Sequence, residues 1–196
     1  KYFPRKTNII GCLKYDIYNF NKEKSKRINK SNYLRKKVVL VCPSIGDENY
    51  LLNYLKESIN TNHTYILSPH PAYQDLIIKK YLLELENKSE IKTFKHLSTF
   101  DLFKISDIVL CGFSTVAYEA LFLGAQPVRV IDPYQPQFFD LKDGLPIVEN
   151  RNKLKKLLKI KKFKNKLPLS NFIKRNYFFK LDNCSKKRFW NSLNRI

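Results

Sequence analysis

From residue 37 onward, short apolar runs alternate with segments whose apolar residues recur at helical spacing. The runs predict strands at 37–42, 64–68, 91–94, 107–111 and 127–131. The periodic segments predict helices at 48–60, 73–86, 99–105, 115–123 and 151–159. Alternating strands and helices are typical of βαβ units, and strands that are apolar on both sides indicate a sheet covered on each face. The pattern predicts a Rossmann-like, three-layer α/β/α domain with a mostly parallel sheet.

The two ends of the chain lack this alternation. Residues 1–36 contain one predicted strand at 8–13, followed by a Lys/Asn-rich stretch that we expect to be an exposed loop. Residues 161–196 are basic and aromatic, and a helix is predicted from Ser185, with Phe189, Trp190 and Leu193 on one face. We therefore divide the chain into a basic amino-terminal segment (1–36), a nucleotide-binding domain (37–160) and a helical segment (161–196) that packs back on the fold.

The net charge of +20 belongs to these flanks. Residues 37–150 hold 10 Lys/Arg against 14 Asp/Glu, whereas residues 151–196 hold 16 against 1. The first interpretation of such flanks is a solvated surface, the second is attraction to an anionic membrane, and nucleic acid comes last. No nucleic-acid-binding motif is present, so we expect no nucleic-acid partner.

The four cysteines are widely spaced and form no C-x-x-C pair. Neither a zinc site nor a small disulfide scaffold is indicated, so we expect reduced thiols, no metal and no cofactor. The apolar runs are much shorter than the roughly 18 residues of a membrane span. These features favour a cytoplasmic protein with a peripheral contact at the inner face of the membrane. The chain contains no Met, and we expect further sequence before Lys1.

The strongest local signal is the segment 107–132, DIVLCGFSTVAYEALFLGAQPVRVID, which predicts a strand, a small-residue turn, a helix and a second strand. A helix that starts at the carboxyl end of a strand presents backbone N–H groups suited to a phosphate. Gly112 permits close approach, while Ser114 and Thr115 add hydroxyl groups. Glu119 lies one turn further, where it can accept hydrogen bonds from a ribose. The competing interpretation is an ordinary capped helix with a solvated Glu119.

Two further turns follow predicted strands. His70 lies between Pro69 and Pro71, which restrict the backbone on both sides of the imidazole, so the ring can donate to a phosphate. The competing interpretation is a structural role for this histidine. Ser44 and Gly46 lie in CPSIGDEN, where backbone N–H groups could face a diphosphate, although no P-loop motif is present. Because ligands of open α/β sheets bind at the carboxyl edge, the three turns together predict one nucleotide site.

These residues resemble the carboxy-terminal nucleotide-binding domain of GT-B glycosyltransferases. The similarity is greatest to bacterial capsule and surface-carbohydrate transferases related to Kdo transferases, polysialyltransferases and CDP-glycerol glycerophosphotransferases. It is carried by His70-Pro71, by Ser114-Thr115 with Glu119, by Gly124 before a strand, and by the closing segment 177–190. The fold it implies is one half of a GT-B fold.

The resemblance implies that His70 and the Ser114/Thr115 pair hold the phosphate of the donor and that Glu119 binds its ribose. His70 is the candidate catalytic residue, acting on the leaving phosphate without a metal. The expected donor is a nucleotide-activated sugar, CMP-linked in preference to CDP- or UDP-linked, and the expected acceptor is a glycan or glycolipid. The general base would come from an amino-terminal domain. The alternatives are an epimerase-like hydrolase of nucleotide sugars and a non-enzymatic basic module that binds nucleic acid or membrane.

Overall fold

The structure is a computed structural model that describes residues 36–44, 46–70, 82–85, 90–94, 97–134, 143–160 and 184–193. The chain divides into two compact units. One consists of residues 28–168, and the other combines residues 1–27 with 169–196. The predicted strand at 8–13, most of the predicted helix at 73–86 and the loop at 22–35 lie outside the described residues.

The larger unit contains a parallel sheet, as the apolar runs predicted. Its strands are β1 (Lys37–Cys42), β2 (His63–Leu67), β3 (Glu90–Lys92), β4 (Ile108–Cys111), β5 (Gln126–Val130) and β6 (Ile147–Val148). Every pairing in the described sheet is parallel, and the strand order is β3-β2-β1-β4-β5-β6. β6 was not predicted, because a strand of two residues leaves no periodic signal. The Rossmann-like α/β fold class is confirmed.

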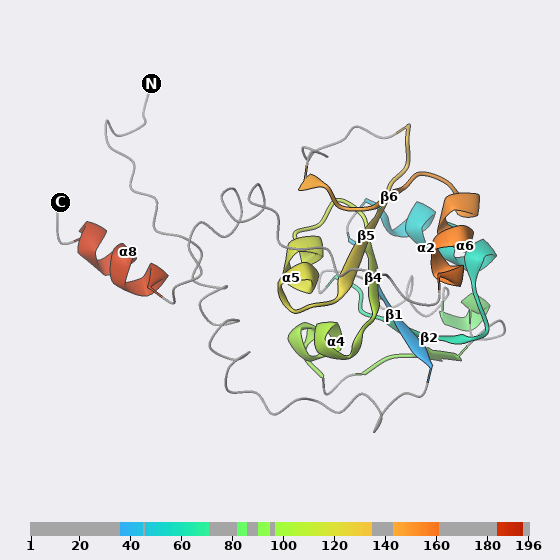
Figure 1. Cartoon of the computed structure of the whole chain (residues 1–196), viewed down its shortest axis with the longest axis horizontal. Helices are drawn as coiled ribbons and strands as arrows, with labels where there is room; N and C mark the ends of the chain where they lie inside the picture. Colours follow the sequence, from blue (N-terminus) through green and yellow to red (C-terminus); the bar gives the residue numbers. More distant parts are fainter. Residues whose placement is uncertain are drawn as a thin grey trace. The chain divides into compact units, whose positions relative to one another are not determined.

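Helices cover both faces of this sheet. They are α2 (Glu48–Ser58), α4 (Thr99–Ile105), α5 (Val116–Phe122) and α6 (Arg151–Lys159). α4 and α5 lie on one side of the sheet, and α2 and α6 lie on the other (Figure 1). The predicted bounds of α4 and α6 are correct, because a side chain caps each start: Ser98 accepts a hydrogen bond from the Asp101 N–H, and Asn150 accepts one from the Lys153 N–H.

The core lies between the sheet and the α2–α6 layer. It includes Val39 and Val41 of β1, Leu51 and Leu55 of α2, and Leu110 of β4 among its buried side chains. β4 is buried along its whole length, as expected for a strand covered by helices on both faces. In the described part of the chain, no helix is long and apolar enough to cross a membrane. The smaller unit contributes α8 (Ser185–Leu193), which confirms the predicted helix; its packing on the fold stays a prediction.

The strand order defines where a ligand would bind. The chain runs outward from β1 to β3 and then returns to the other side of β1 as β4. Connections therefore leave β1 and β4 in opposite directions, and the carboxyl ends of these two strands open a crevice between their loops. Ser44 follows β1 and Ser114 follows β4, so two of the predicted site residues flank this switch point.

We expect truncation of the central strand to destabilise the whole domain. Leu110 is completely buried, so Leu110→Ala should lower the free energy of unfolding by about 2–5 kcal/mol. Urea denaturation of the chain measures this change. Leu83→Ala is the matched control, because Leu83 is 68% exposed and its truncation should change stability by less than about 0.5 kcal/mol. Equal losses in the two variants would contradict the assignment of the core.

Candidate functional site

A small pocket lies at the switch point of the sheet. Its volume is about 80 Å³, far below the roughly 300–1,000 Å³ of typical small-molecule pockets. The wall is formed by residues at the ends of β1 and β2 and at the starts of α4 and α5, namely Cys42, Pro43, Ser44, Ser68, Pro69, His70, Thr99, Ser114 and Val116. The pocket is therefore a partial site with room for a phosphate-sized group.

Three of the predicted site residues meet in this pocket, namely Ser44, His70 and Ser114. The sequence interpretation missed Ser68 and Thr99. Both follow the rule that identified the others, since Ser68 directly follows β2 and Thr99 begins α4. The predicted end of the strand at 64–68 and the predicted start of the helix at 99–105 were enough to identify both residues.

The other predicted residues lie around the pocket. Thr115 is exposed at the start of α5, and Gly46 is exposed in the turn after β1 with φ +92°, a left-handed conformation that favours glycine. Gly112 and Glu119 are buried. Pro71 lies outside the described residues, so its part in the site stays a prediction.

The turn after β1 is held together by the carboxylate of Asp47. Asp47 is only 3% exposed and accepts two hydrogen bonds from Ser44, one from the backbone N–H and one from the hydroxyl, both at 2.7 Å. Both donors of Ser44 are therefore engaged within the turn. The backbone N–H of His70 donates to the Pro43 carbonyl at 3.2 Å, which joins the ends of β1 and β2. These contacts fix the shape of the pocket floor.

Gly112 is required by its contact with Asp47. A Cβ atom placed at position 112 would lie 2.0 Å from the Asp47 Oδ2 atom, a distance that real Cβ atoms do not show. The sequence interpretation left open whether a ligand or the protein itself comes close to Gly112. In this structure the Asp47 side chain occupies that space. The turn after β4 is therefore packed directly on the turn after β1.

Glu119 is 3% exposed, so the interpretation of this carboxylate as a solvated group on an ordinary helix is wrong. It lies on the buried side of α5, close enough to the thiol of Cys42 to affect its titration. Burial raises the pKa of the Cys42 thiol, with smaller contributions from Cys111 and the nearby carboxylates. Burial likewise raises the pKa of Cys111 to about 12. Both thiols are protonated at neutral pH, which makes them poor nucleophiles.

A buried ion pair supports the turn after β4 from the other side. Arg129 of β5 is completely buried, and its Nη2 atom lies 3.0 Å from the Asp143 Oδ2 atom. The Nη1 atom of Arg129 donates to the Gly112 carbonyl at 3.0 Å. The Tyr118 hydroxyl also donates to Asp143, at 2.9 Å. No pattern in the sequence predicted this cluster, because an Arg within a short strand ordinarily predicts an exposed position.

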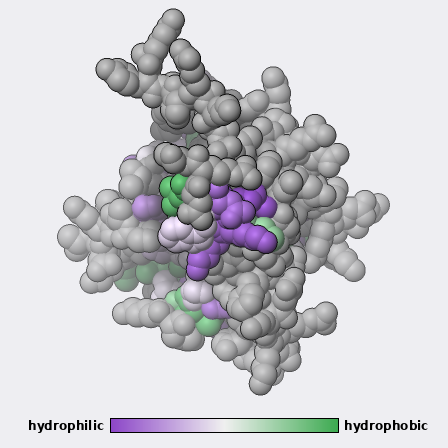
Figure 2. Space-filling view, turned by 90° about the vertical axis from the view of Figure 1, so that its left-hand side faces the viewer, coloured by the Kyte–Doolittle hydropathy of each residue, from purple (hydrophilic) through white to green (hydrophobic). Residues whose placement is uncertain are grey.

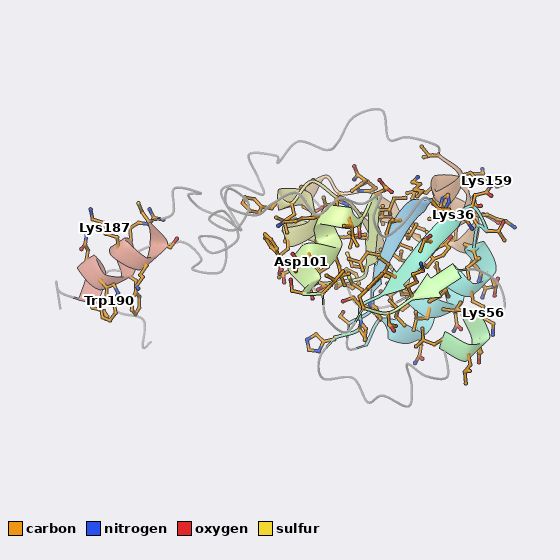
Figure 3. The ribbon with its side chains drawn as sticks, turned by 90° about the horizontal axis from the view of Figure 1, so that it is seen from below. Lys36, Lys56, Asp101, Lys159, Lys187 and Trp190 are labelled. Atoms are coloured by element: carbon orange, nitrogen blue, oxygen red, sulfur yellow. The ribbon has the colours of Figure 1, made fainter. Side chains whose placement is uncertain are left out.

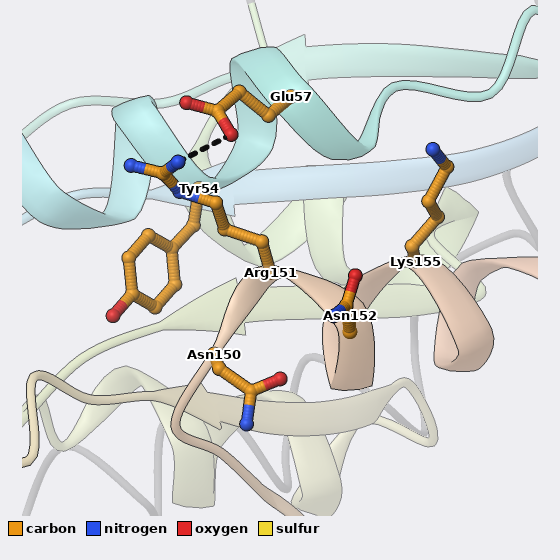
Figure 4. Close-up of a pocket in the computed structure, with 6 residues that line it drawn as sticks. All are labelled: Tyr54, Glu57, Asn150, Arg151, Asn152 and Lys155. Atoms are coloured by element: carbon orange, nitrogen blue, oxygen red, sulfur yellow. Dashed lines mark ion pairs between the residues drawn. The ribbon is translucent and has the colours of Figure 1, made fainter.

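A larger hollow of about 510 Å³ lies on the surface between α2 and α6, away from the switch point (Figure 4). Two of its residues form an ion pair. Arg151 pairs with Glu57 at 2.6 Å, and the Arg151 guanidinium lies 5.9 Å from the centre of the Tyr54 ring. Size alone would favour this hollow, but it contains none of the predicted site residues. We therefore place the candidate site in the smaller pocket.

Comparison by sequence finds a relative among known proteins. The chain is 28% identical over 147 residues to the teichoic acid glycerol-phosphate primase of Bacillus subtilis strain 168, a match that covers 69% of this chain and 35% of that protein. No family model matches the chain.

Solved structures with a similar fold include the wall teichoic acid polymerase TagF soaked with CDPG. It has 19% identity and a TM-score of 0.56, with 96% of this chain and 50% of that chain covered. The UDP-GlcNAc 2-epimerase of Methanocaldococcus jannaschii in complex with UDP-GlcNAc and UDP has 20% identity and a TM-score of 0.60, with 96% and 55% covered. The putative UDP-N-acetylglucosamine 2-epimerase of Listeria monocytogenes has 14% identity and a TM-score of 0.63, with 94% and 52% covered.

The sheet order and the helices on both faces define a Rossmann-like α/β domain, the fold that this chain shares with one half of the wall teichoic acid polymerase and of the 2-epimerases. The resemblance to surface-carbohydrate transferases is confirmed, and it lies on the CDP-glycerol glycerophosphotransferase side. The chain spans about half the length of these solved structures and 35% of its curated relative.

The close packing of Gly112 on Asp47 gives a direct test of the site's construction. Gly112→Ala should destabilise the chain by about 1–3 kcal/mol, because the added methyl group must displace the Asp47 carboxylate. Urea denaturation measures the loss. Gly144→Ala is a control without a steric clash, because nothing lies within 4 Å of a Cβ added at Gly144. Any loss of stability in this variant comes from backbone strain at φ +76°.

A double-mutant cycle separates the steric clash from other causes. Asp47→Ala removes the carboxylate that the new methyl group meets, so it should cost less in the Gly112→Ala background than in the wild type. The difference should be about 0.5–3 kcal/mol. Strictly additive losses would refute direct contact between the two positions.

Proposed function

We propose that this chain is the nucleotide-binding part of a transferase that builds a cell-surface polymer, of the kind that makes teichoic acid. The single observation that carries the proposal is the convergence of Ser44, His70 and Ser114 on one pocket at the switch point of a parallel sheet. Ligands of open α/β sheets bind at such points. The sequence similarity to a glycerol-phosphate primase supports the polymer class.

The donor that we propose is a nucleoside diphosphate derivative, with CDP preferred over CMP. The sequence interpretation favoured a CMP-linked sugar. We now prefer a CDP-linked donor because of two comparisons with known proteins. The curated relative is a glycerol-phosphate primase, and a solved structure with the same fold was soaked with CDPG. The pocket accepts a phosphate-sized group, which fits a donor whose remaining atoms extend beyond the pocket.

In this proposal His70 and Ser114 contact the phosphate that leaves with the nucleotide. His70 is exposed at the end of β2, so its imidazole is accessible to a bound anion. The Ser114 oxygen accepts a hydrogen bond from the Val116 N–H at 3.3 Å, which leaves the hydroxyl proton to donate. Hydrogen bonds to a charged phosphate are stronger than neutral ones. Glu119, one turn along α5, is proposed to bind the ribose.

The reaction requires more than this pocket. An acceptor hydroxyl on a glycan or glycolipid forms a bond to the group that the donor transfers. The bond between that group and the nucleotide breaks, and the nucleotide leaves with its phosphate stabilised by the turn after β4. We propose that the base that removes the acceptor proton lies on a second domain facing the pocket. A small, open pocket fits such an arrangement, because the second domain would complete the enclosure.

A hydrolase that resembles the 2-epimerases is the alternative enzyme. The epimerase structures share the fold at 20% identity or less, a level of likeness that concerns the fold alone. The sequence relative is a teichoic acid glycerol-phosphate primase, so we favour transfer. Release of free sugar from a nucleotide sugar by the full-length protein without an acceptor would instead favour hydrolysis.

The nucleotide proposal predicts an order of affinities. CDP should bind more tightly than cytidine, and His70→Ala should weaken CDP binding by roughly 10- to 100-fold through the loss of a charged hydrogen bond worth about 1.5–3 kcal/mol. Glu119→Gln should weaken both CDP and cytidine, because a ribose contact is common to both. Isothermal titration calorimetry with CDP, CMP and UDP measures the preference.

Thr93→Ala provides the control for these variants. Thr93 is exposed beyond β3 and does not line the pocket, so its truncation should leave CDP affinity unchanged. The proposal fails when the wild-type chain shows no CDP affinity. The assignment of His70 fails when His70→Ala binds CDP as the wild type does.

We further propose that the exposed face of α6 contacts an anionic membrane surface. Lys155, Lys156 and Lys159 are all exposed on this helix, while Leu154 and Leu158 on its other side are buried. Lys159 and Lys36 lie at the same end of the sheet (Figure 3). Such clusters gain about 1 kcal/mol per basic residue near an anionic membrane surface.

The smaller unit also carries exposed basic residues. α8 exposes Lys186 and Lys187, and its Trp190 is 53% exposed. Near the centre of Figure 2, hydrophilic side chains in purple lie next to hydrophobic side chains in green. Basic groups next to apolar ones are typical of helices that lie at a membrane interface.

Charge reversal tests the membrane contact. Lys155→Glu with Lys156→Glu should weaken cosedimentation with phosphatidylglycerol vesicles by tenfold or more, on the order of 1 kcal/mol per charge. Lys92→Glu with Lys104→Glu changes the net charge equally on β3 and α4, and should have a smaller effect. Equal losses would indicate attraction by net charge alone. Binding to phosphatidylcholine vesicles that matches phosphatidylglycerol would contradict the electrostatic mechanism.

A further inference from the structure

Arg129 is the least expected side chain near the pocket. It lies in β5 and is completely buried, although an arginine is almost never fully buried unless it is paired. Its Nε and Nη2 atoms donate to the same Asp143 oxygen, at 3.2 Å and 3.0 Å. The third contact, from Nη1 to the Gly112 carbonyl at 3.0 Å, reaches the turn after β4. One guanidinium therefore joins a buried carboxylate to the backbone beside the pocket.

Asp143 is itself held in place from two other directions. Its Oδ2 atom accepts a hydrogen bond from the Tyr118 hydroxyl at 2.9 Å, and its Oδ1 atom accepts one from the Leu145 N–H at 3.0 Å. The guanidinium of Arg129 also lies 5.2 Å from the centre of the Tyr118 ring. These contacts leave Arg129 one orientation, which directs Nη1 at Gly112.

The hydrogen bond to Gly112 fixes a whole peptide group. A trans peptide is planar, and its carbonyl and the following N–H point in opposite directions. The peptide that joins Gly112 to Phe113 is therefore held at its carbonyl by Arg129. Ser114, which lines the pocket, follows directly after this peptide.

The charge of Arg129 does not act on the ligand directly. The guanidinium is neutralised by Asp143 and sealed from solvent, since both side chains are 0% exposed. Its influence on a bound anion must therefore pass through the geometry of the turn. Ser114, which lines the pocket, is two residues from the carbonyl that Arg129 holds.

We propose that Arg129 is a positioning residue for phosphate recognition. By holding the Gly112 carbonyl, it orients the turn 112–114 so that Ser114 presents its hydroxyl to the donor phosphate. Asp143 and Tyr118 keep Arg129 in this orientation. This inference rests on the proposed nucleotide-binding function and adds how the phosphate part of the site is preorganised.

The test compares a ligand that carries phosphate with one that does not. CDP binding is measured by calorimetry and cytidine binding by ligand-observed NMR, each on the wild-type chain and on Arg129→Lys. A lysine keeps the charge but cannot make the three directed contacts. We expect CDP affinity to fall tenfold or more and cytidine affinity to stay within twofold.

Two further variants control for folding. Arg129→Met with Asp143→Leu removes both charges together, which avoids an unpaired buried charge and preserves the fold while losing the Gly112 contact. It should show the same selective loss of CDP affinity. Leu158→Ala creates a cavity in α6, far along the chain from the turn, and should lower the melting temperature without changing the ratio of CDP to cytidine affinity.

The outcomes test the role of Arg129 and the proposed nucleotide-binding function separately. A wild-type chain that binds neither ligand overturns the proposed function and the inference with it. A wild type that binds CDP, with Arg129 variants that bind CDP equally well, overturns the inference alone. Parallel losses of CDP and cytidine affinity also overturn it, because they would assign Arg129 a purely structural role.

Discussion

Gly112 is held between two buried side chains of opposite charge, and the arrangement of the site depends on this constraint. The Asp47 carboxylate fills the space where a Cβ would stand, and the Arg129 guanidinium binds the carbonyl. The first contact joins the turns after β1 and β4, and the second joins β4 to β5. Three neighbouring strand ends are thereby fixed relative to one another at one glycine. A rigid edge of this kind lets short loops hold a ligand without a large cost in ordering them.

The sequence predicted the layers of the fold better than the contacts that shape the site. β1, α4 and α6 were predicted with correct bounds, because apolar periodicity and polar residues at the helix starts act locally. Arg129 is different. Its burial depends on Asp143, which lies 14 residues away and meets it only in the folded chain. Spacing along the sequence does not predict such a pair, so the hydrogen bond from Arg129 to the Gly112 carbonyl was not predicted.

The same distinction applies to the site residues. Ser44, His70 and Ser114 were predicted to meet because each follows a strand, and parallel strands end at one edge. What the pattern could not provide is which donors remain for a ligand. The Ser44 N–H and hydroxyl both donate to Asp47, and the His70 N–H donates to the Pro43 carbonyl, while the His70 residue as a whole is exposed. Proximity to the pocket follows from topology, but hydrogen-bonding capacity follows from the three-dimensional contacts of each atom.

The charges around the pocket limit what this domain can contribute to binding a diphosphate. Arg129 is neutralised by Asp143, and the buried carboxylates of Asp47 and Glu119 lie close by. The turn 112–114 can therefore supply direction through backbone and hydroxyl donors, but little net positive charge. A donor with two phosphates requires further compensation, which His70 can supply only in part. The remaining positive charge would have to come from groups that face the pocket. A second domain that closes over the pocket would supply such groups with the least change to the site itself.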